Sequence, residues 1–169
     1  MAVAMHNDDM RWQGHLQHIH IAPAASYEME ALAEARLVAG RGIEGDRYFL
    51  GTGTYSKLPA VREVTLIESE VLEALARNDP PLQDQPIVLA PHEHRRNLTV
   101  RGVPLGHLVG RRFRVGPVVL RGARINFPCR YLEQLLDRPL FMALYNRGGL
   151  NCAIETGGVI RCGDLIEPL

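Results

Sequence analysis

The residues with the clearest chemical potential lie in the segment INFPCRYLE, residues 125–133, where Cys129 stands between Pro128 and Arg130. Proline favours the first turn of a helix, and the following RYLEQLL has apolar residues at helical spacing. Free backbone N–H groups and the positive end of the helix dipole stabilise a thiolate at such a position. Arg124 and Arg130 add positive charge on either side. The segment predicts a reactive, partly exposed thiol, and a small buried core residue is the alternative.

The other two cysteines have plainer surroundings. Cys152 alternates with apolar neighbours in LNCAIE, which predicts a core position, and Cys162 precedes Gly163 in a predicted turn. Three cysteines without paired spacing predict free thiols in a reducing compartment, and hence a cytoplasmic location.

Arginine is unevenly distributed along the chain. Residues 95–130 hold nine arginines and no Asp or Glu, while Lys57 is the single lysine. Genome composition could explain arginine in place of lysine, but it does not explain the missing acids. The run therefore predicts a site for phosphate or carboxylate, which arginine binds in a bidentate way. We expect Arg47, Arg96 and Arg124 to converge near Cys129.

The overall composition excludes other classes of ligand. The formal net charge is zero and aromatic residues make up 6% of the chain, so neither a polyanion-binding surface nor a base-stacking platform is indicated. We therefore expect no nucleic-acid partner. No apolar run is long enough to span a bilayer, and the N-terminus has no secretory signal pattern.

The segment GRGIEGD, residues 40–46, contains the spacing G-x-G-x-x-G. A dinucleotide site requires a long helix after this motif, but the following DRYFLGTG is aromatic and broken by glycine. The glycines are better explained as turn residues with positive φ. Asp46 and Arg47 then form either a surface ion pair or an arginine aimed at an anion, and both interpretations stay open.

Histidines occur in two clusters that could begin a zinc site. His18 and His20 would share one face of a strand, and His92 and His94 repeat the same spacing. No cysteine or acid completes the first cluster nearby, so ordinary strand and loop histidines are favoured.

The elements that must position these residues are short and mostly extended. HLQHIHIAP, REVTLI, NLTVRG and the segments after residue 110 alternate as strands, with Gly157 and Gly158 at a hairpin position. EMEALAEARLV has a helical composition, although its second half could be a strand. ESEVLEALARN predicts a helix with Val71, Leu72 and Leu75 on its apolar face. We expect an N-terminal arm over residues 1–14 and one mostly β domain over residues 15–169.

Five stretches in order resemble the MOSC domain, the C-terminal domain of molybdenum-cofactor sulfurase. They are GIEGDRYF, REVTLIESEVLEAL, RRNLTVRGVPLGHLVGRRFRVG, PC with a short helix, and RGGLNCAIETGGVIRCGD. The resemblance implies a largely antiparallel β-barrel with a few short helices, as in small stand-alone bacterial members. It implies that Cys129 is the functional residue, and that Arg47, Arg96 and Asn97 lie near the pterin and phosphate of a molybdenum cofactor.

The resemblance implies two roles for Cys129. It would ligate molybdenum in members that hold the cofactor, or carry sulfur as a persulfide in the sulfurase lineage. We expect no desulfurase or electron-transfer domain fused to the matching region. We therefore expect a cysteine desulfurase or molybdoenzyme partner, with pyridoxal phosphate entering only through that desulfurase. The alternatives are a non-catalytic module that binds an anion or pterin phosphate, and a component of a molybdenum-cofactor-dependent reductase.

Overall fold

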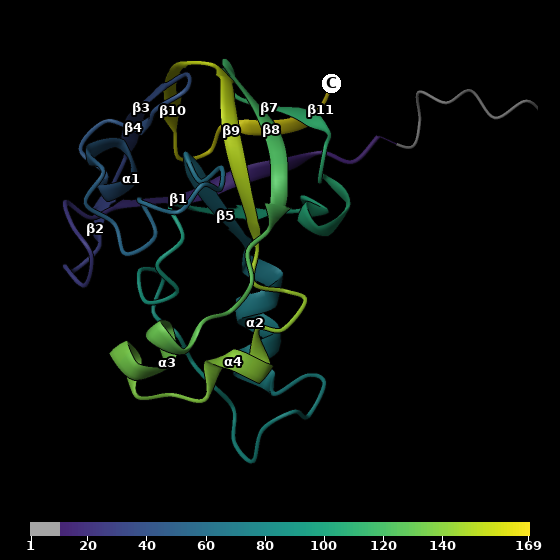
Figure 1. Ribbon diagram of the computed structural model, residues 1–169. Helices are drawn as coiled ribbons and strands as arrows, with labels where there is room; N and C mark the ends of the chain where they lie inside the picture. The colour runs from purple at the N-terminus through teal and green to yellow at the C-terminus, as the bar shows by residue number, and fades with distance from the viewer. Residues whose placement is uncertain (1–10) are drawn as a thin grey trace, which may run out of the picture.

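The computed structural model describes residues 11–169 (Figure 1). Its elements, in chain order, are β1 (Gly14–Ile21), β2 (Glu30–Leu32), β3 (Glu34–Val38), β4 (Gly42–Ile43), α1 (Arg47–Leu50), β5 (Val64–Glu68), α2 (Ser69–Arg77), β6 (Leu98–Arg101), η1 (Leu105–His107), β7 (Arg112–Val115), β8 (Val118–Ile125), α3 (Arg130–Leu136), α4 (Leu140–Ala143), β9 (Leu150–Thr156), β10 (Gly158–Arg161) and β11 (Leu165–Pro168).

Seven of these strands close into a barrel in the order β11-β7-β8-β9-β5-β6-β1, and pairing of β1 with β11 completes the ring. β2 extends the sheet from β1. The β5–β6 pair is parallel, and the other pairs of the ring are antiparallel. The predicted mostly β, largely antiparallel barrel with short helices is confirmed.

Strict alternation of side chains builds the barrel wall. In β7, Phe113 and Val115 are buried while Arg112 and Arg114 are exposed. Because successive strand residues point to opposite faces, this pattern turns one apolar face inward and leaves the arginines in solvent.

A second, smaller sheet has the order β10-β3-β4 and corrects two sequence predictions. The first half of EMEALAEARLV forms β2 rather than a helix, and the strand alternative for its second half is correct, because pairing with β1 and with β10 outweighs the helical composition. Gly157 and Gly158 do not make a hairpin, since β9 pairs with β5 and β8 whereas β10 pairs with β3. At Gly157 a Cβ would lie 2.6 Å from the Leu37 carbonyl oxygen, so the chain crosses between sheets where only glycine fits.

Helices α2, α3 and α4 lie together at one end of the barrel (Figure 1). They share a small apolar cluster of their own, in which Leu75 and Leu132 are buried. Val71 and Leu72 pack against it, which confirms the predicted apolar face of α2. The chain leaves β8, passes through residues 126–129 and enters α3, so this helical layer fixes Cys129 at the barrel end.

The expected N-terminal arm falls largely on residues 1–10, which lie outside the described residues. Gly14 already belongs to β1, and Trp12 packs against the barrel core.

Candidate functional site

Cys129 is the N-cap residue of α3 and is partly buried. Its φ of −133° and ψ of 151° are extended, so the chain turns into the helix immediately after it. Two residues later, the Tyr131 hydroxyl hydrogen-bonds with Ser26 Oγ at 2.6 Å, which ties the first turn of α3 to the loop after β1. The thiol lies at a helix start as expected, but at the N-cap, one residue before the first turn in which the sequence predicts it.

Cys129 lines a cavity of about 260 Å³ between this end of the barrel and α3. Five arginines line the same cavity, and no Asp or Glu does. They are Arg47, Arg62, Arg95, Arg96 and Arg124. We call these residues the arginine pocket. The structure thus brings together three residues singled out from the sequence, Arg47, Arg96 and Arg124, with Cys129.

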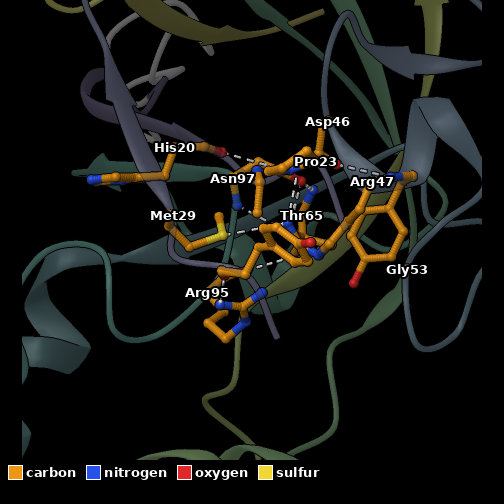
Figure 2. A network of polar contacts seen from close by, with 12 residues as sticks. His20, Pro23, Met29, Asp46, Arg47, Gly53, Thr65, Arg95 and Asn97 are labelled. Carbon is orange, nitrogen blue, oxygen red and sulfur yellow. Dashed lines mark hydrogen bonds and ion pairs between the residues drawn. The ribbon is translucent and has the colours of Figure 1, made fainter. Parts of the chain in front are cut away.

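Arg47 enters the pocket from the N-terminus of α1 and is almost fully buried. Its Nη1 donates to Asp46 Oδ1 at 3.0 Å, and its Nη2 donates to the Arg95 carbonyl oxygen at 2.8 Å (Figure 2). The Asp46 carboxylate also accepts the backbone N–H groups of Ala22 and Tyr48, which caps α1. The surface-ion-pair interpretation is wrong, because this pair is buried and rigidly held.

Arg95 has a φ of 61°, a left-handed conformation that a non-glycine residue rarely adopts. Its Nη1 donates to the Tyr27 carbonyl oxygen at 2.6 Å. Its Nη2 is buried without a hydrogen-bond partner among the described residues. A buried donor in this state is costly unless a ligand satisfies it. Burial lowers the pKa of the Arg95 guanidinium.

Arg96 is buried and is held by carbonyl groups rather than by an acid. Its Nε donates to Gly148 O at 3.0 Å and its Nη1 to His94 O at 2.7 Å. A Cβ at Gly148 would collide with the Asn126 carbonyl oxygen, and one at Gly149 with the Leu66 carbonyl oxygen. The two glycines therefore let the chain entering β9 approach closely enough to hold the arginine. Burial lowers the pKa of Arg96, and the nearby Cys129 sulfur opposes that shift.

Asn97 does not line the pocket. It is fully buried, its Nδ2 donates to His20 O, and its Oδ1 accepts from the backbone and hydroxyl of Thr65 (Figure 2). The residue joins the start of β6 to β1 and β5. Through these hydrogen bonds Asn97 holds the segment that carries Arg95 and Arg96, and it makes no direct contact with the cavity.

The Cys129 sulfur is surrounded by groups that the sequence reasoning missed. Tyr55 lines the pocket with Cys129, and burial, followed by the interaction with Cys129, raises the Tyr55 pKa to about 12. Arg62 stacks on the Tyr55 ring with its guanidinium carbon 4.9 Å from the ring centre. Burial lowers the Arg62 pKa, and the Cys129 sulfur is among the groups that oppose the shift. Both residues come from the loop between α1 and β5, which has no periodic pattern to identify them.

Charge in the arginine pocket is largely uncompensated. Within residues 11–169, Arg47 is the pocket arginine that has a carboxylate within ion-pair distance. The lack of acids in residues 95–130 does not leave every arginine of that run unpaired. Arg101 pairs with Glu73, and both Arg112 and Arg121 pair with Glu155. The pocket thus combines residues from that run with Arg47 and Arg62 from outside it.

The remaining thiols differ from Cys129. Cys152 is fully buried in β9, and burial raises the pKa of its thiol. Cys162 is exposed in the turn after β10, and its sulfur lies 3.5 Å from the Leu32 carbonyl oxygen. All three cysteines are free.

The histidines pack behind the pocket rather than around a metal. Over the described part of the chain, no group of three or more His, Cys, Asp or Glu side chains is arranged to hold a metal ion. His94 Nδ1 accepts the Arg96 N–H, so its proton is on Nε2, which donates to Thr99 Oγ1. Burial lowers the pKa of His94 well below its usual value and that of His20 to about 4.

The family comparison matches the model of the MOSC domain to residues 14–167. A comparison with curated proteins finds no significant match. No helix within residues 11–169 combines the length and the apolar character that a membrane crossing requires.

Solved structures share this fold. The YuaD protein from Bacillus subtilis has a TM-score of 0.75 at 22% identity, with 93% of this chain and 96% of that protein covered. YiiM from Escherichia coli has a TM-score of 0.63 at 19% identity, with 95% and 70% covered. YiiM from Geobacillus stearothermophilus has a TM-score of 0.64 at 13% identity, with 92% and 75% covered. At these identities the likeness establishes the fold alone.

Proposed function

This chain belongs to the MOSC domain family, which is associated with molybdenum cofactor binding or sulfuration, and we propose that it is a sulfur carrier that serves this cofactor through Cys129. The observation behind the proposal is the placement of Cys129 in the wall of a pocket lined by five arginines and no acid. A thiol alone would not indicate a ligand, whereas a thiol facing concentrated positive charge indicates an anionic one.

The side chains present fit a molybdenum cofactor. Its phosphate would bind to the pocket arginines, where the buried Nη2 of Arg95 lacks a protein partner. The cofactor would supply a sulfur-rich molybdenum centre that accepts sulfur. Cys129, Arg47, Arg96 and Arg124 are the proposed contacting residues, and Asn97 acts by positioning Arg95 and Arg96.

The proposed transfer begins when the Cys129 thiolate attacks the terminal sulfur of a donor persulfide. The new bond joins Cys129 Sγ to that sulfur, the donor S–S bond breaks, and the electron pair leaves on the donor thiolate. Arg62, Arg96 and Tyr55 line the same pocket as Cys129, and their positive charge and hydroxyl would stabilise the negative charge that develops during transfer. A cytoplasmic cysteine desulfurase would be the partner, with pyridoxal phosphate bound to that partner.

The alternative is a direct metal ligand. The half-buried thiol at the pocket wall also suits a thiolate that binds molybdenum, because thiolates are soft ligands. The two roles differ in one measurable property: a carrier acquires an extra sulfur atom and a ligand retains stoichiometric metal.

Persulfide loading tests the proposal. The protein is incubated with a cysteine desulfurase and cysteine, and the added sulfur is located by mass spectrometry of peptides. We expect it on the Cys129 peptide, with complete loss in Cys129→Ser and no change in Cys162→Ser, the matched control for an accessible thiol. Stoichiometric molybdenum that is lost in Cys129→Ser, with no persulfide in the wild type, would establish the ligand role instead. A protein that does neither but still binds phosphate would be a binding module.

A further inference from the structure

We propose that the arginine pocket also takes sulfur directly from a small dianion that contains a sulfane sulfur, with thiosulfate as the probe. This inference rests on the proposed carrier function and names a class of donor for the same thiol. Thiosulfate carries a transferable sulfur on one side and three sulfonate oxygens on the other. A pocket that accepts it needs a nucleophilic thiol and several oxyanion-binding groups in one enclosed space, without nearby negative charge.

The charge balance of the pocket fits a dianion. Asp46 neutralises Arg47, but Arg62, Arg95, Arg96 and Arg124 have no ion-pair partner within residues 11–169. Burial lowers the pKa of three of these guanidiniums, which reflects the cost of desolvating positive charge without a partner. An entering anion removes part of that cost. Planar guanidinium groups also bind sulfonate oxygens in the bidentate way in which they bind phosphate or carboxylate.

The distribution of donors gives the ligand a direction. Arg95 lies on the segment that leads into β6 and keeps an unpartnered Nη2 in the interior. Arg62, Arg96 and Tyr55 line the pocket together with Cys129. The sulfonate end would therefore bind among the arginines while the sulfane sulfur points to Cys129. Arg124, which is exposed at the same wall, would contact the anion from the entrance.

The chemical step balances without another reactant. The Cys129 thiolate attacks the sulfane sulfur, and a bond forms between Cys129 Sγ and that atom. The bond between the sulfane sulfur and the sulfonate sulfur breaks, and its electron pair leaves with sulfite. The products are the Cys129 persulfide and one sulfite ion. Arginines beside the leaving group stabilise the negative charge that develops on it.

One pocket would then serve two anions in turn. Sulfite must leave before the phosphate of a cofactor can occupy the arginines, so loading and delivery are separate half-reactions. Inorganic phosphate should accordingly compete with thiosulfate.

The experiment measures sulfite release and the persulfide on the Cys129 peptide after incubation with thiosulfate alone. We expect one sulfite for each persulfide, none with Cys129→Ser, and competitive inhibition by phosphate. In Arg62→Gln and Arg124→Gln the apparent KM for thiosulfate should rise on the order of tenfold or more, since each loses a charge-assisted contact. Arg36→Gln, an exposed arginine of β3 that lies outside the pocket, is the matched control and should be unchanged. Arg124 is exposed, so its variant should fold even if Arg62→Gln does not.

The outcomes separate this inference from the carrier function. Loading by desulfurase and cysteine, but not by thiosulfate, overturns the small-donor proposal and leaves the carrier function intact. Sulfur on Cys162 in equal amount, or an unchanged KM in Arg124→Gln, shows solution chemistry at an exposed thiol and also overturns it. Loading by thiosulfate with the expected stoichiometry and arginine dependence supports it, even if no desulfurase loads the protein.

Discussion

Arginine and cysteine each occur in two settings, the arginine pocket and the barrel wall, and the settings give them opposite properties. On the wall, Arg112 and Arg121 share the carboxylate of Glu155, at 2.6 and 2.5 Å. In the pocket, Arg95 and Arg96 are held by backbone carbonyl groups rather than by carboxylates, so their charge stays available for a ligand. Cys152 is sealed in the wall, whereas Cys129 opens to the pocket. Residue type alone therefore does not identify the site, and the presence or absence of a protein partner does.

The largest effect should follow from breaking the one ion pair of the pocket. Asp46→Asn leaves Arg47 buried with no carboxylate and weakens the cap of α1. We expect a loss of about 3–5 kcal/mol in the free energy of unfolding, as for other buried charges that lose a partner. Urea denaturation followed by circular dichroism measures it. The control is Glu44→Gln, which removes the exposed partner of Arg36 and should leave the midpoint unchanged. If both variants unfold at the wild-type midpoint, the buried pair has no structural role.

The histidines behind the pocket should make the fold sensitive to acid. The pKa of His20 falls from 6.5 to about 4 in the folded chain, chiefly by burial, so the unfolded chain binds its proton first. Stability from this group is fully present above pH 6.5 and is lost as the pH falls towards 4. We expect a decrease on the order of 2 kcal/mol over this interval, with His94 adding in the same direction.

Denaturation at a series of pH values tests the histidine prediction. His20→Leu should flatten the curve, whereas His107→Gln, which changes an exposed histidine, should reproduce the wild-type curve. A wild-type protein with equal stability at both ends of the interval would show that the buried histidines do not titrate on unfolding.

The sequence predicts the barrel because polar and apolar residues alternate in segments such as RFRV, and the folded strand keeps this local pattern. It does not predict β2 and leaves β3 as an alternative to helix, because their partners, β1 and β10, impose an extended conformation that composition does not encode. The Gly157–Gly158 pair was misassigned for a related reason. A glycine pair marks a close approach of the backbone, but the partner strand lies far away in the sequence.

The site was predictable only in part, because some of its residues have a local signal in the sequence and others do not. Cys129 has a helix start as a local signal, and Arg96 belongs to the acid-free run. Arg62 and Tyr55 come from an irregular loop, so tertiary placement alone reveals them. The acid-free run predicts more unpaired arginines than the structure has, because carboxylates from α2 and β9 form ion pairs with Arg101, Arg112 and Arg121.

A smaller effect should come from the cysteine of the wall. Cys152→Ala removes a fully buried sulfur from the barrel core and leaves a small cavity, so we expect a loss of about 1–2 kcal/mol in unfolding free energy. Persulfide loading of the folded variant should equal that of the wild type. If loading disappears while the circular dichroism spectrum is retained, Cys152 rather than Cys129 is the working thiol.

The smallest effect should follow Glu155→Gln, which releases two arginines of the wall at once. The hydrogen bonds from Arg121 and Arg112 hold the pKa of Glu155 below its usual value. These ion pairs therefore stabilise the fold while the Glu155 carboxylate is ionised, and the stabilisation is lost as the pH falls through the lowered pKa of the folded state. All three side chains are solvent-accessible, and water and salt screen the interaction. The denaturation midpoint should therefore shift within experimental scatter at physiological ionic strength and slightly downward at low salt. Thiosulfate and phosphate binding should be unchanged, because the released arginines lie outside the pocket. A gain in anion affinity would show instead that any unpaired arginine of this chain suffices, and that the carbonyl-held geometry of the pocket contributes nothing.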